Sequence, residues 1–280
     1  MLVTESIEEV RQLRWAEPTL SWGFVPTMGY LHEGHLSLVR QARQDNDRVA
    51  VSIYVNPMQF APTEDLSTYP RNLERDLLLV KEAGADLVFT PSNAVMYPPA
   101  YQTHITVAEV SRVLEGVSRP NHFAGVATVV AKLFNIVQPT RAYFGQKDAQ
   151  QTVVLRQMVQ DLNMPLDLVV CPTVRHADGL AMSSRNVYLS PTERTAATVL
   201  YRALTAAQHA VLDGQREAMV LRHVMTEVLS AEPLARIDYI SAADPVTLAE
   251  LTQVNTGVLL SMAVFIGRTR LIDNVLLSDL

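Results

Sequence analysis

Apolar and polar positions over the first 175 residues follow two periods in turn, one typical of strands and one typical of helices. The apolar run Trp22–Val25 and the β-branched run Arg48–Val55 predict buried strands. Between them, a helical spacing of apolar residues begins near Glu33 and continues to Ala42. The same criteria predict strands at 86–90, 141–144 and 166–170, and helices at 6–14, 72–83, 123–137 and 148–162. Strands that alternate with helices are typical of parallel strands joined by crossovers, so we expect a doubly wound α/β domain over residues 1–175.

The pattern changes after about residue 175. Ser190, Pro191 and Glu193 combine an N-cap, a proline at the first helical position and a capping glutamate, which predicts a long helix that ends near Asp213. A second helix is predicted at 217–230, followed by strands at 237–241, 257–266 and 269–273, with Gly267-Arg268 as a hairpin turn. We therefore expect a smaller α+β domain over residues 176–280.

The segment after the first predicted buried strand carries two histidines at a helix start. His32 and His35 are three positions apart, so they lie on one face of a helical turn. A helix N-terminus exposes unpaired N–H groups and partial positive charge, which suits phosphate. A zinc site is the weaker interpretation, because Cys171 is the only cysteine and the remaining histidines are scattered. The segment predicts phosphate chemistry, with a nucleotide as the expected substrate.

Further polar clusters follow other predicted strands. Gly145–Asp148 lies between a strand and a helix, and its Lys147 offers a positive charge to phosphate. Ser183–Arg185 supplies hydroxyl and guanidinium donors in the region that joins the two domains. The amides of Asn56, Gln59 and Gln151 suit hydroxyl and carboxylate groups. Each cluster alone could be a plain turn or surface loop, but ligands of doubly wound sheets bind beyond the strand carboxyl ends, where these clusters are expected to meet.

Composition limits the class of protein. The chain has 280 residues, of which 48% are hydrophobic and 19% charged, as in an ordinary soluble enzyme. A net charge of −6 argues against a nucleic-acid partner. One cysteine excludes an intrachain disulfide and suits a reducing cytoplasm. We find no signal peptide and no apolar stretch near the ~20 residues of a membrane span, so we expect a cytoplasmic protein without a membrane partner.

Six motifs occur in an order that resembles one enzyme family. They are Met28-Gly-Tyr-Leu-His-Glu-Gly-His35, Val55-Asn-Pro-Met-Gln-Phe60, Tyr69-Pro-Arg71, His122-Phe-Ala-Gly-Val126, Phe144-Gly-Gln-Lys-Asp148 and Met182-Ser-Ser-Arg-Asn186. Together they resemble the AMP-forming pantoate–β-alanine ligases, densely over residues 20–190 and more loosely beyond. The His-x-Gly-His element alone is shared with nucleotidyltransferases and class I aminoacyl-tRNA synthetases. The resemblance implies a Rossmann-like, nucleotidyltransferase-like first domain and a C-terminal lid.

The resemblance also implies a two-step reaction and a set of site residues. Pantoate attacks the α-phosphorus of ATP to give pantoyl adenylate, and β-alanine then displaces AMP. His35 is the implied proton donor, with His32, Lys147 and Arg185 as the other catalytic groups. Implied ATP contacts are Met28, Gly29, Tyr30, Leu31, His32, Glu33, Gly34, His35, Gly145, Gln146, Lys147, Asp148, Val174, Met182, Ser183, Ser184 and Arg185. Gln59 and Gln151, with Asn56 beside them, are expected to hold pantoate and β-alanine, and Asp76 matches a position associated with Mg²⁺.

Some expectations rest on the resemblance alone, and two alternatives stay open. The family is usually homodimeric through the first domain, and a hinge near 179–186 would let the second domain close. The sequence departs from the family at Gln146, where glutamate is frequent, and at Asn121, where glycine is usual. The alternative functions are a nucleotidyltransferase and a nucleotide-binding regulator that has lost catalysis.

Overall fold

A parallel sheet of six strands forms the first unit of the chain. The structure is a computed structural model that describes residues 1–62 and 64–278. The strands are β1 (Leu2–Thr4), β2 (Trp22–Thr27), β3 (Arg48–Ile53), β4 (Leu87–Phe89), β5 (Arg141–Gly145) and β6 (Asp167–Cys171). Their order is β1-β4-β3-β2-β5-β6, and every neighbouring pair is parallel. The chain therefore builds outward in opposite directions from the β2–β5 pair, which is the switch point of a doubly wound sheet.

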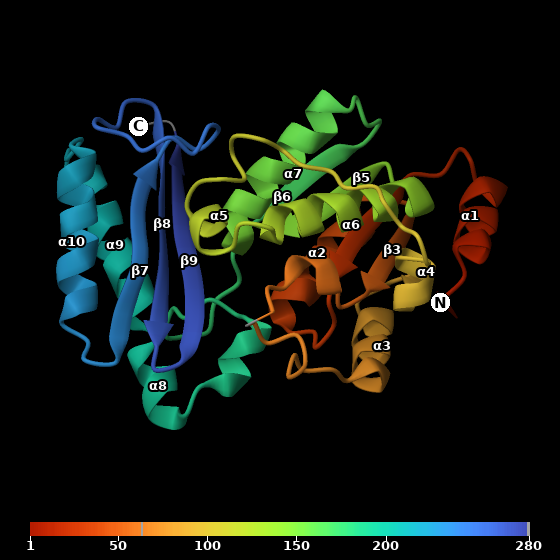
Figure 1. Cartoon of the computed structure of the whole chain (residues 1–280), viewed down its shortest axis with the longest axis horizontal. Coiled ribbons are helices and arrows are strands. Elements are labelled where there is room, and N and C mark those ends of the chain that lie inside the picture. Colours follow the sequence, from red (N-terminus) through yellow and green to blue (C-terminus); the bar gives the residue numbers. More distant parts are fainter. Residues whose placement is uncertain (63, 279–280) are drawn as a thin grey trace.

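Helices cover both faces of this sheet (Figure 1). They are α1 (Ile7–Ala16), α2 (Glu33–Asp45), α3 (Leu73–Glu82), α4 (Asn93–Met96), α5 (Glu115–Ser118), α6 (His122–Val137) and α7 (Ala149–Asp161). Alternate residues of β2 point to opposite faces, so Phe24 joins the core beneath α6 whereas Val25 joins the core beneath α2. The strongly apolar α6 is buried along most of its length, as its sequence predicts. The predicted doubly wound α/β fold is confirmed.

The second unit is a three-stranded antiparallel sheet with helices packed on it. It comprises α8 (Pro191–Ala196), α9 (Val199–Leu212), α10 (Ala218–Ser230), β7 (Ala235–Ala243), β8 (Gly257–Ile266) and β9 (Thr269–Ser278). The strand order is β7-β8-β9, and Ile266 pairs with Thr269 across the predicted hairpin turn. This unit has its own buried cluster, drawn almost wholly from α9, α10 and the three strands. It lies at the opposite end of the molecule from α1 (Figure 1). A domain boundary near residue 175 stays a prediction.

Several elements differ from the sequence prediction. The short helices α4 and α5 were not predicted, and β7 and β9 extend beyond the strands expected at 237–241 and 269–273. The long helix expected from Ser190 to Asp213 is two helices, because α8 ends at Ala196 and α9 begins at Val199. The hydroxyl of Thr198 donates to the carbonyl of Thr195 at this junction, which competes with the helical backbone bonds. The edge strand β1 was not predicted, since its three residues are too few to show a period. Among the residues that the structure describes, no helix is both long enough and apolar enough to cross a membrane.

Candidate active site

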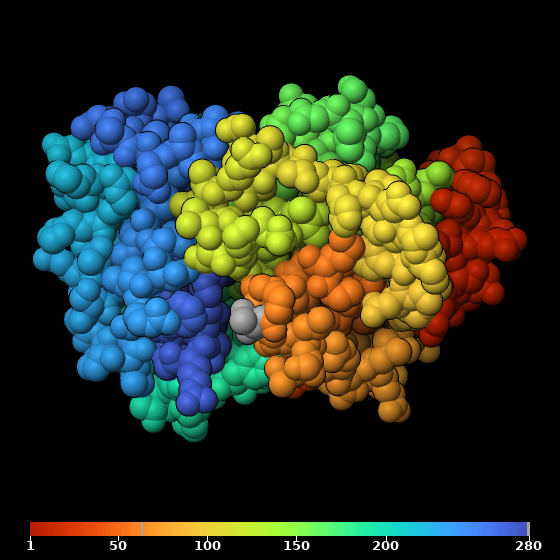
Figure 2. Space-filling view, in the orientation of Figure 1, coloured from red at the N-terminus to blue at the C-terminus, as the bar shows by residue number. Residues whose placement is uncertain are grey.

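A cavity of about 810 Å³ lies where the two units meet, at the carboxyl ends of β2 and β5. The segments after both strands line it, together with the loop that crosses to the second unit and residues of β7, β8 and β9. Residues of the amino-terminal half and of the C-terminal sheet come together along this face of the molecule (Figure 2). The position is the switch point at which doubly wound sheets bind ligands.

The histidine turn forms the start of α2. His32 is the N-cap in an extended conformation, and its carbonyl accepts from the N–H groups of His35 and Leu36. The rings of His32 and His35 are 4.1 Å apart between centroids. Gly34 makes this packing possible, because a Cβ there would lie 2.9 Å from the His32 ring. Both rings line the cavity beside the positive end of the helix.

Both histidines are neutral at pH 7 in this environment. Burial lowers the pKa of His35 to about 4. Burial, followed by the nearby charges of His35 and Lys147, lowers the pKa of His32 to about 3. The Nδ1 atom of His32 is buried and has no hydrogen-bond partner among the described residues. It lies against the start of α2, where a Cβ on Gly34 would be 2.9 Å away from it.

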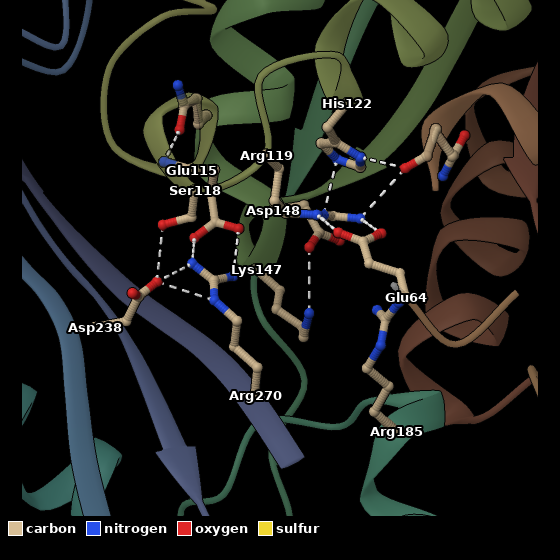
Figure 3. A network of polar contacts seen from close by, with 12 residues as sticks. Glu64, Glu115, Ser118, Arg119, His122, Lys147, Asp148, Arg185, Asp238 and Arg270 are labelled. Atoms are coloured by element: carbon tan, nitrogen blue, oxygen red, sulfur yellow. Dashed lines mark hydrogen bonds and ion pairs between the residues drawn. The ribbon is translucent and has the colours of Figure 1, made fainter. Parts of the chain in front are cut away.

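Lys147 and Asp148 follow β5 in a 3₁₀ turn, Gln146–Asp148, and face the same cavity. The Lys147 Nζ is 3.2 Å from Oδ1 of Asp148 (Figure 3). Although burial opposes ionisation, the Lys147 ammonium group lowers the pKa of the Asp148 carboxyl. The pair brings one positive charge close to the histidine turn while keeping the Asp148 carboxylate ionised.

Arg185 enters from the crossing loop, at the start of the 3₁₀ turn Ser184–Tyr188. The Ser183 hydroxyl accepts from the backbone N–H of Arg185, and the Ser184 hydroxyl donates to the carbonyl of Tyr30. The guanidinium binds Asp65 with two hydrogen bonds of 3.0 Å each. The loop is thus attached to the histidine turn and presents Arg185 to the cavity.

Gln59 presents a neutral amide from the 3₁₀ turn Pro57–Gln59, and Gln151 does so from α7. Asn56 was expected to contact the substrate, but it is 1% exposed and lies behind Gln59. Its amide donates to Oε1 of Gln59 and to the carbonyl of Gly125, and its Oδ1 accepts from the Tyr97 hydroxyl. Asn56 therefore holds Gln59 in place from beneath the cavity.

Asp76 does not fit the expected magnesium position. Its side chain is 2% exposed, and its oxygens accept from the backbone N–H groups of Tyr30 and Leu31 at 2.6 and 2.8 Å. It lies outside the cavity lining and fixes the turn that leads to His32. Within residues 1–62 and 64–278, no cluster of three or more histidine, cysteine or acidic side chains could hold a metal ion.

The structure brings most of the implied ATP contacts to the cavity wall. Those that line it are Met28, His32, Gly34, His35, Gly145, Lys147, Asp148, Val174, Met182, Ser183, Ser184 and Arg185. Gly29, Tyr30 and Leu31 instead form the turn behind the wall, and Glu33 pairs with Arg40 on the surface. The Gln146 amide donates to Oδ1 of Asn274, so this departure from the family lies at the contact between the units.

Sequence reasoning missed a polar network on the opposite wall. Arg119 and His122 line the cavity with Glu64, and Arg270 of β9 binds both Glu115 and Asp238 (Figure 3). His122 stood in a quoted motif, but its spacing gave no sign of its partners. The other departure, Asn121, has φ −101°, so this position does not require glycine.

Comparison with known proteins agrees with the resemblance found in the sequence. The sequence model of the pantoate-beta-alanine ligase family matches residues 2–276. The chain is 58% identical to pantothenate synthetase of Herpetosiphon aurantiacus over 280 residues, which cover 99% of this chain and 100% of that protein. It is 59% identical to pantothenate synthetase of Chloroflexus aurantiacus over 278 residues, which cover 99% of this chain and 98% of that protein.

Solved structures of such enzymes share the fold over nearly the whole length. The crystal structure of pantothenate synthetase from Thermus thermophilus has a TM-score of 0.94 at 48% identity and covers 98% of this chain and 99% of that chain. The Francisella tularensis pantoate-beta-alanine ligase, complexed with beta-gamma ATP and beta-alanine, has a TM-score of 0.80 at 35% identity, with coverage of 99% and 97%. This chain belongs to the pantoate–β-alanine ligase family.

Proposed function

We propose that the cavity joins (R)-pantoate to β-alanine at the expense of ATP. The pantoate carboxylate attacks the α-phosphorus of ATP and expels pyrophosphate, which leaves an enzyme-bound pantoyl adenylate. The amine of β-alanine then attacks the acyl carbon, loses a proton and expels AMP. The observation that carries the proposal is the shared cavity, which gathers the histidine turn, Lys147, Arg185 and Gln59 from separate segments.

The groups around the start of α2 bind the phosphates of ATP in this proposal. The positive end of this helix and the rings of His32 and His35 offer hydrogen bonds to phosphate oxygens. Lys147 and Arg185 supply positive charge where negative charge develops at the α-phosphorus. Because these groups are held before the nucleotide binds, little reorganisation is needed during the reaction.

Neutral amide side chains bind pantoate, the organic acid, in this proposal. Gln59 and Gln151 can hydrogen-bond the hydroxyls and carboxylate of pantoate without neutralising its charge. A cationic residue in direct contact would make the carboxylate a poorer nucleophile. The amide pair therefore orients the attacking oxygen while leaving its electron density available for the α-phosphorus.

Magnesium is an expected companion of ATP, and the described residues offer it no ready-made site. Mg²⁺ keeps several waters and binds chiefly through substrate phosphates in such enzymes. We therefore give the ion no protein ligand set and assign Asp76 a structural role. Bound to the triphosphate, Mg²⁺ would neutralise part of its charge.

The expected cellular setting rests on the family resemblance. The Francisella tularensis relative was solved with beta-gamma ATP and beta-alanine, which supports a site that takes both substrates here. We expect the enzyme to act as a cytoplasmic homodimer through its first unit. We also expect the second unit to close over the acyl adenylate and exclude water, with a hinge near 179–186. Solution scattering with and without ATP and pantoate tests closure, and unchanged profiles would count against a large movement.

The experiment is a product assay. The protein is incubated with ATP, Mg²⁺, pantoate and β-alanine, and AMP and pantothenate are quantified. We expect equal amounts of the two products, both dependent on β-alanine. AMP formation that ignores β-alanine would refute the proposal, a nucleotide-linked product would indicate a nucleotidyltransferase, and ATP binding without turnover would indicate a regulator.

A further inference from the structure

Two consecutive acidic residues each hold an arginine of the cavity wall. Glu64 binds Arg119 with Nε–Oε1 and Nη2–Oε2 distances of 2.6 and 2.7 Å. Asp65 binds Arg185 with two contacts of 3.0 Å. All four side chains line the cavity, and between 17% and 32% of each is exposed. A two-residue segment thus joins Arg119, at the end of α5, to the loop that crosses to the second unit.

Arg119 and His122 link Glu64 to the backbone of Gln59, and the donor and acceptor of each hydrogen bond in this link can be assigned. The Gln59 carbonyl accepts from Arg119 Nη2 at 3.3 Å and from His122 Nδ1 at 2.9 Å. Since a carbonyl only accepts, His122 carries its proton on Nδ1, and its Nε2 accepts from Arg119 Nη1 at 3.2 Å. Glu64, Arg119 and His122 therefore fix the backbone of the residue that presents its amide to the cavity.

The 3₁₀ turn Pro57–Gln59, which carries Gln59, packs closely against α6 at Gly125. A Cβ on Gly125 would lie 2.3 Å from the carbonyl oxygen of Met58 and 2.7 Å from the backbone nitrogen of Gln59. The Asn56 amide also donates to the Gly125 carbonyl. Because there is no free space between this turn and α6, a small shift of Arg119 or His122 would also move Gln59.

The Asp65 contact orients Arg185 by one edge of its guanidinium. Asp65 takes the edge formed by Nε and Nη2, which leaves Nη1 available to a ligand in the cavity. A two-point contact fixes the plane of the guanidinium as well as its position. A single flexible arginine would lose rotamer freedom on binding phosphate, whereas this one is already ordered.

We propose that Glu64 and Asp65 are positioning residues for two different substrates of the reaction. Glu64 positions Gln59 for pantoate, acting through Arg119 and His122. Asp65 positions Arg185 for the phosphate. The inference rests on the proposed function. It predicts that two adjacent acids have separable effects on kinetics, although both belong to ion pairs of the same kind. A purely structural pair of contacts would change stability without this separation.

The test measures pantoate-dependent exchange of labelled pyrophosphate into ATP without β-alanine, which isolates adenylate formation. Glu64→Gln is expected to raise the KM for pantoate about 10-fold and to leave the maximal rate and the KM for ATP within about 3-fold. Asp65→Asn is expected to lower the maximal rate about 10- to 100-fold and to leave the KM for pantoate within about 3-fold. Glu64→Asp and Asp65→Glu keep the charge and should recover part of each loss.

Glu17→Gln is the matched control. Glu17 binds Arg48 through Nε and Nη2 in the same two-point manner, at the amino end of β3 and away from the cavity. It should leave exchange unchanged, and thermal unfolding of all variants shows whether they are folded. Wild-type kinetics in folded Glu64→Gln or Asp65→Asn, or the same change of both parameters in both, would overturn the inference. Absence of exchange in the wild-type enzyme would instead refute the proposed function.

Discussion

The Nδ1 atom of His35 accepts a hydrogen bond from the backbone N–H of His32, with 3.4 Å between the nitrogens. Because an acceptor nitrogen carries no proton, the neutral His35 ring carries its proton on Nε2. The helix start therefore fixes the tautomer of the residue expected to donate to phosphate. His35 can act as a hydrogen-bond donor without being positively charged.

This tautomer predicts different outcomes for two substitutions of His35. His35→Asn keeps an acceptor near the Nδ1 position but removes the Nε2 donor, and it should slow adenylate formation about 100-fold. His35→Gln keeps an N–H near the Nε2 position and should lose less. Pyrophosphate exchange measures both rates. Equal rates in the two variants would show that the Nε2 proton has no part in the step.

Lys147 is predicted to contribute to the lowered pKa of both histidines. Its ammonium group contributes to the lowered pKa of His32 and of His35, after burial in each case. Lys147→Met should raise both pKa values towards 6.5 and slow adenylate formation about 100-fold or more. NMR titration of ring-labelled histidine measures the pKa values. Unchanged His32 and His35 titration would contradict the placement of Lys147 beside them.

Periodicity and turn chemistry predicted the sheet because they act locally. The buried strand β2, the start of α2 and the stop of α3 at Gly84, whose φ is +101°, each depend on a few neighbouring residues. The predicted convergence of strand-end clusters also held, since parallel strands place their carboxyl ends at one edge of the sheet.

Contacts between distant segments could not be predicted in this way. Asn56 and Asp76 have residue types that suit ligands, yet their partners at Gly125 and Tyr30 turn both into buried supports. The pairing of Asp65 with Arg185 spans 120 positions, and nothing in the spacing of either residue indicates it. Such roles depend on tertiary packing rather than on a local pattern.

The lowered histidine pKa values predict acid sensitivity. The pKa of His122 falls to about 4, mainly through burial and then through the charge of Arg119, and His32 and His35 are lowered as well. The unfolded chain binds these protons near pH 6.5, so the stabilising contribution is complete above that pH and is lost as the pH falls towards 4. Each neutral histidine then contributes a slope of up to about 1.4 kcal/mol per pH unit.

Urea unfolding at several pH values between 7.5 and 4.5 measures this slope. His122→Asn should flatten it, because one proton-binding difference between the folded and unfolded chain is removed. A free energy of unfolding that rises as the pH falls from 6.5 to 4.5 would contradict the account.

Asp76 is predicted to matter for stability and not for the metal. Asp76→Asn places an amide group against two backbone N–H donors in a buried site, which should lower the free energy of unfolding by about 1–3 kcal/mol. The Mg²⁺ concentration that gives half-maximal activity should stay the same. Chemical unfolding and a Mg²⁺ activation curve measure the two quantities. A large shift of the activation curve with unchanged stability would restore Asp76 as a metal ligand.

The most direct test follows an oxygen atom. Pantoate labelled with ¹⁸O in both carboxylate positions is converted in the presence of ATP, Mg²⁺ and β-alanine, and the AMP is analysed by mass spectrometry. Attack of the carboxylate on the α-phosphorus, followed by departure of AMP from the acyl carbon, predicts one ¹⁸O atom in each AMP. AMP without ¹⁸O would show that the carboxylate never bonded to the α-phosphorus and would contradict the central claim.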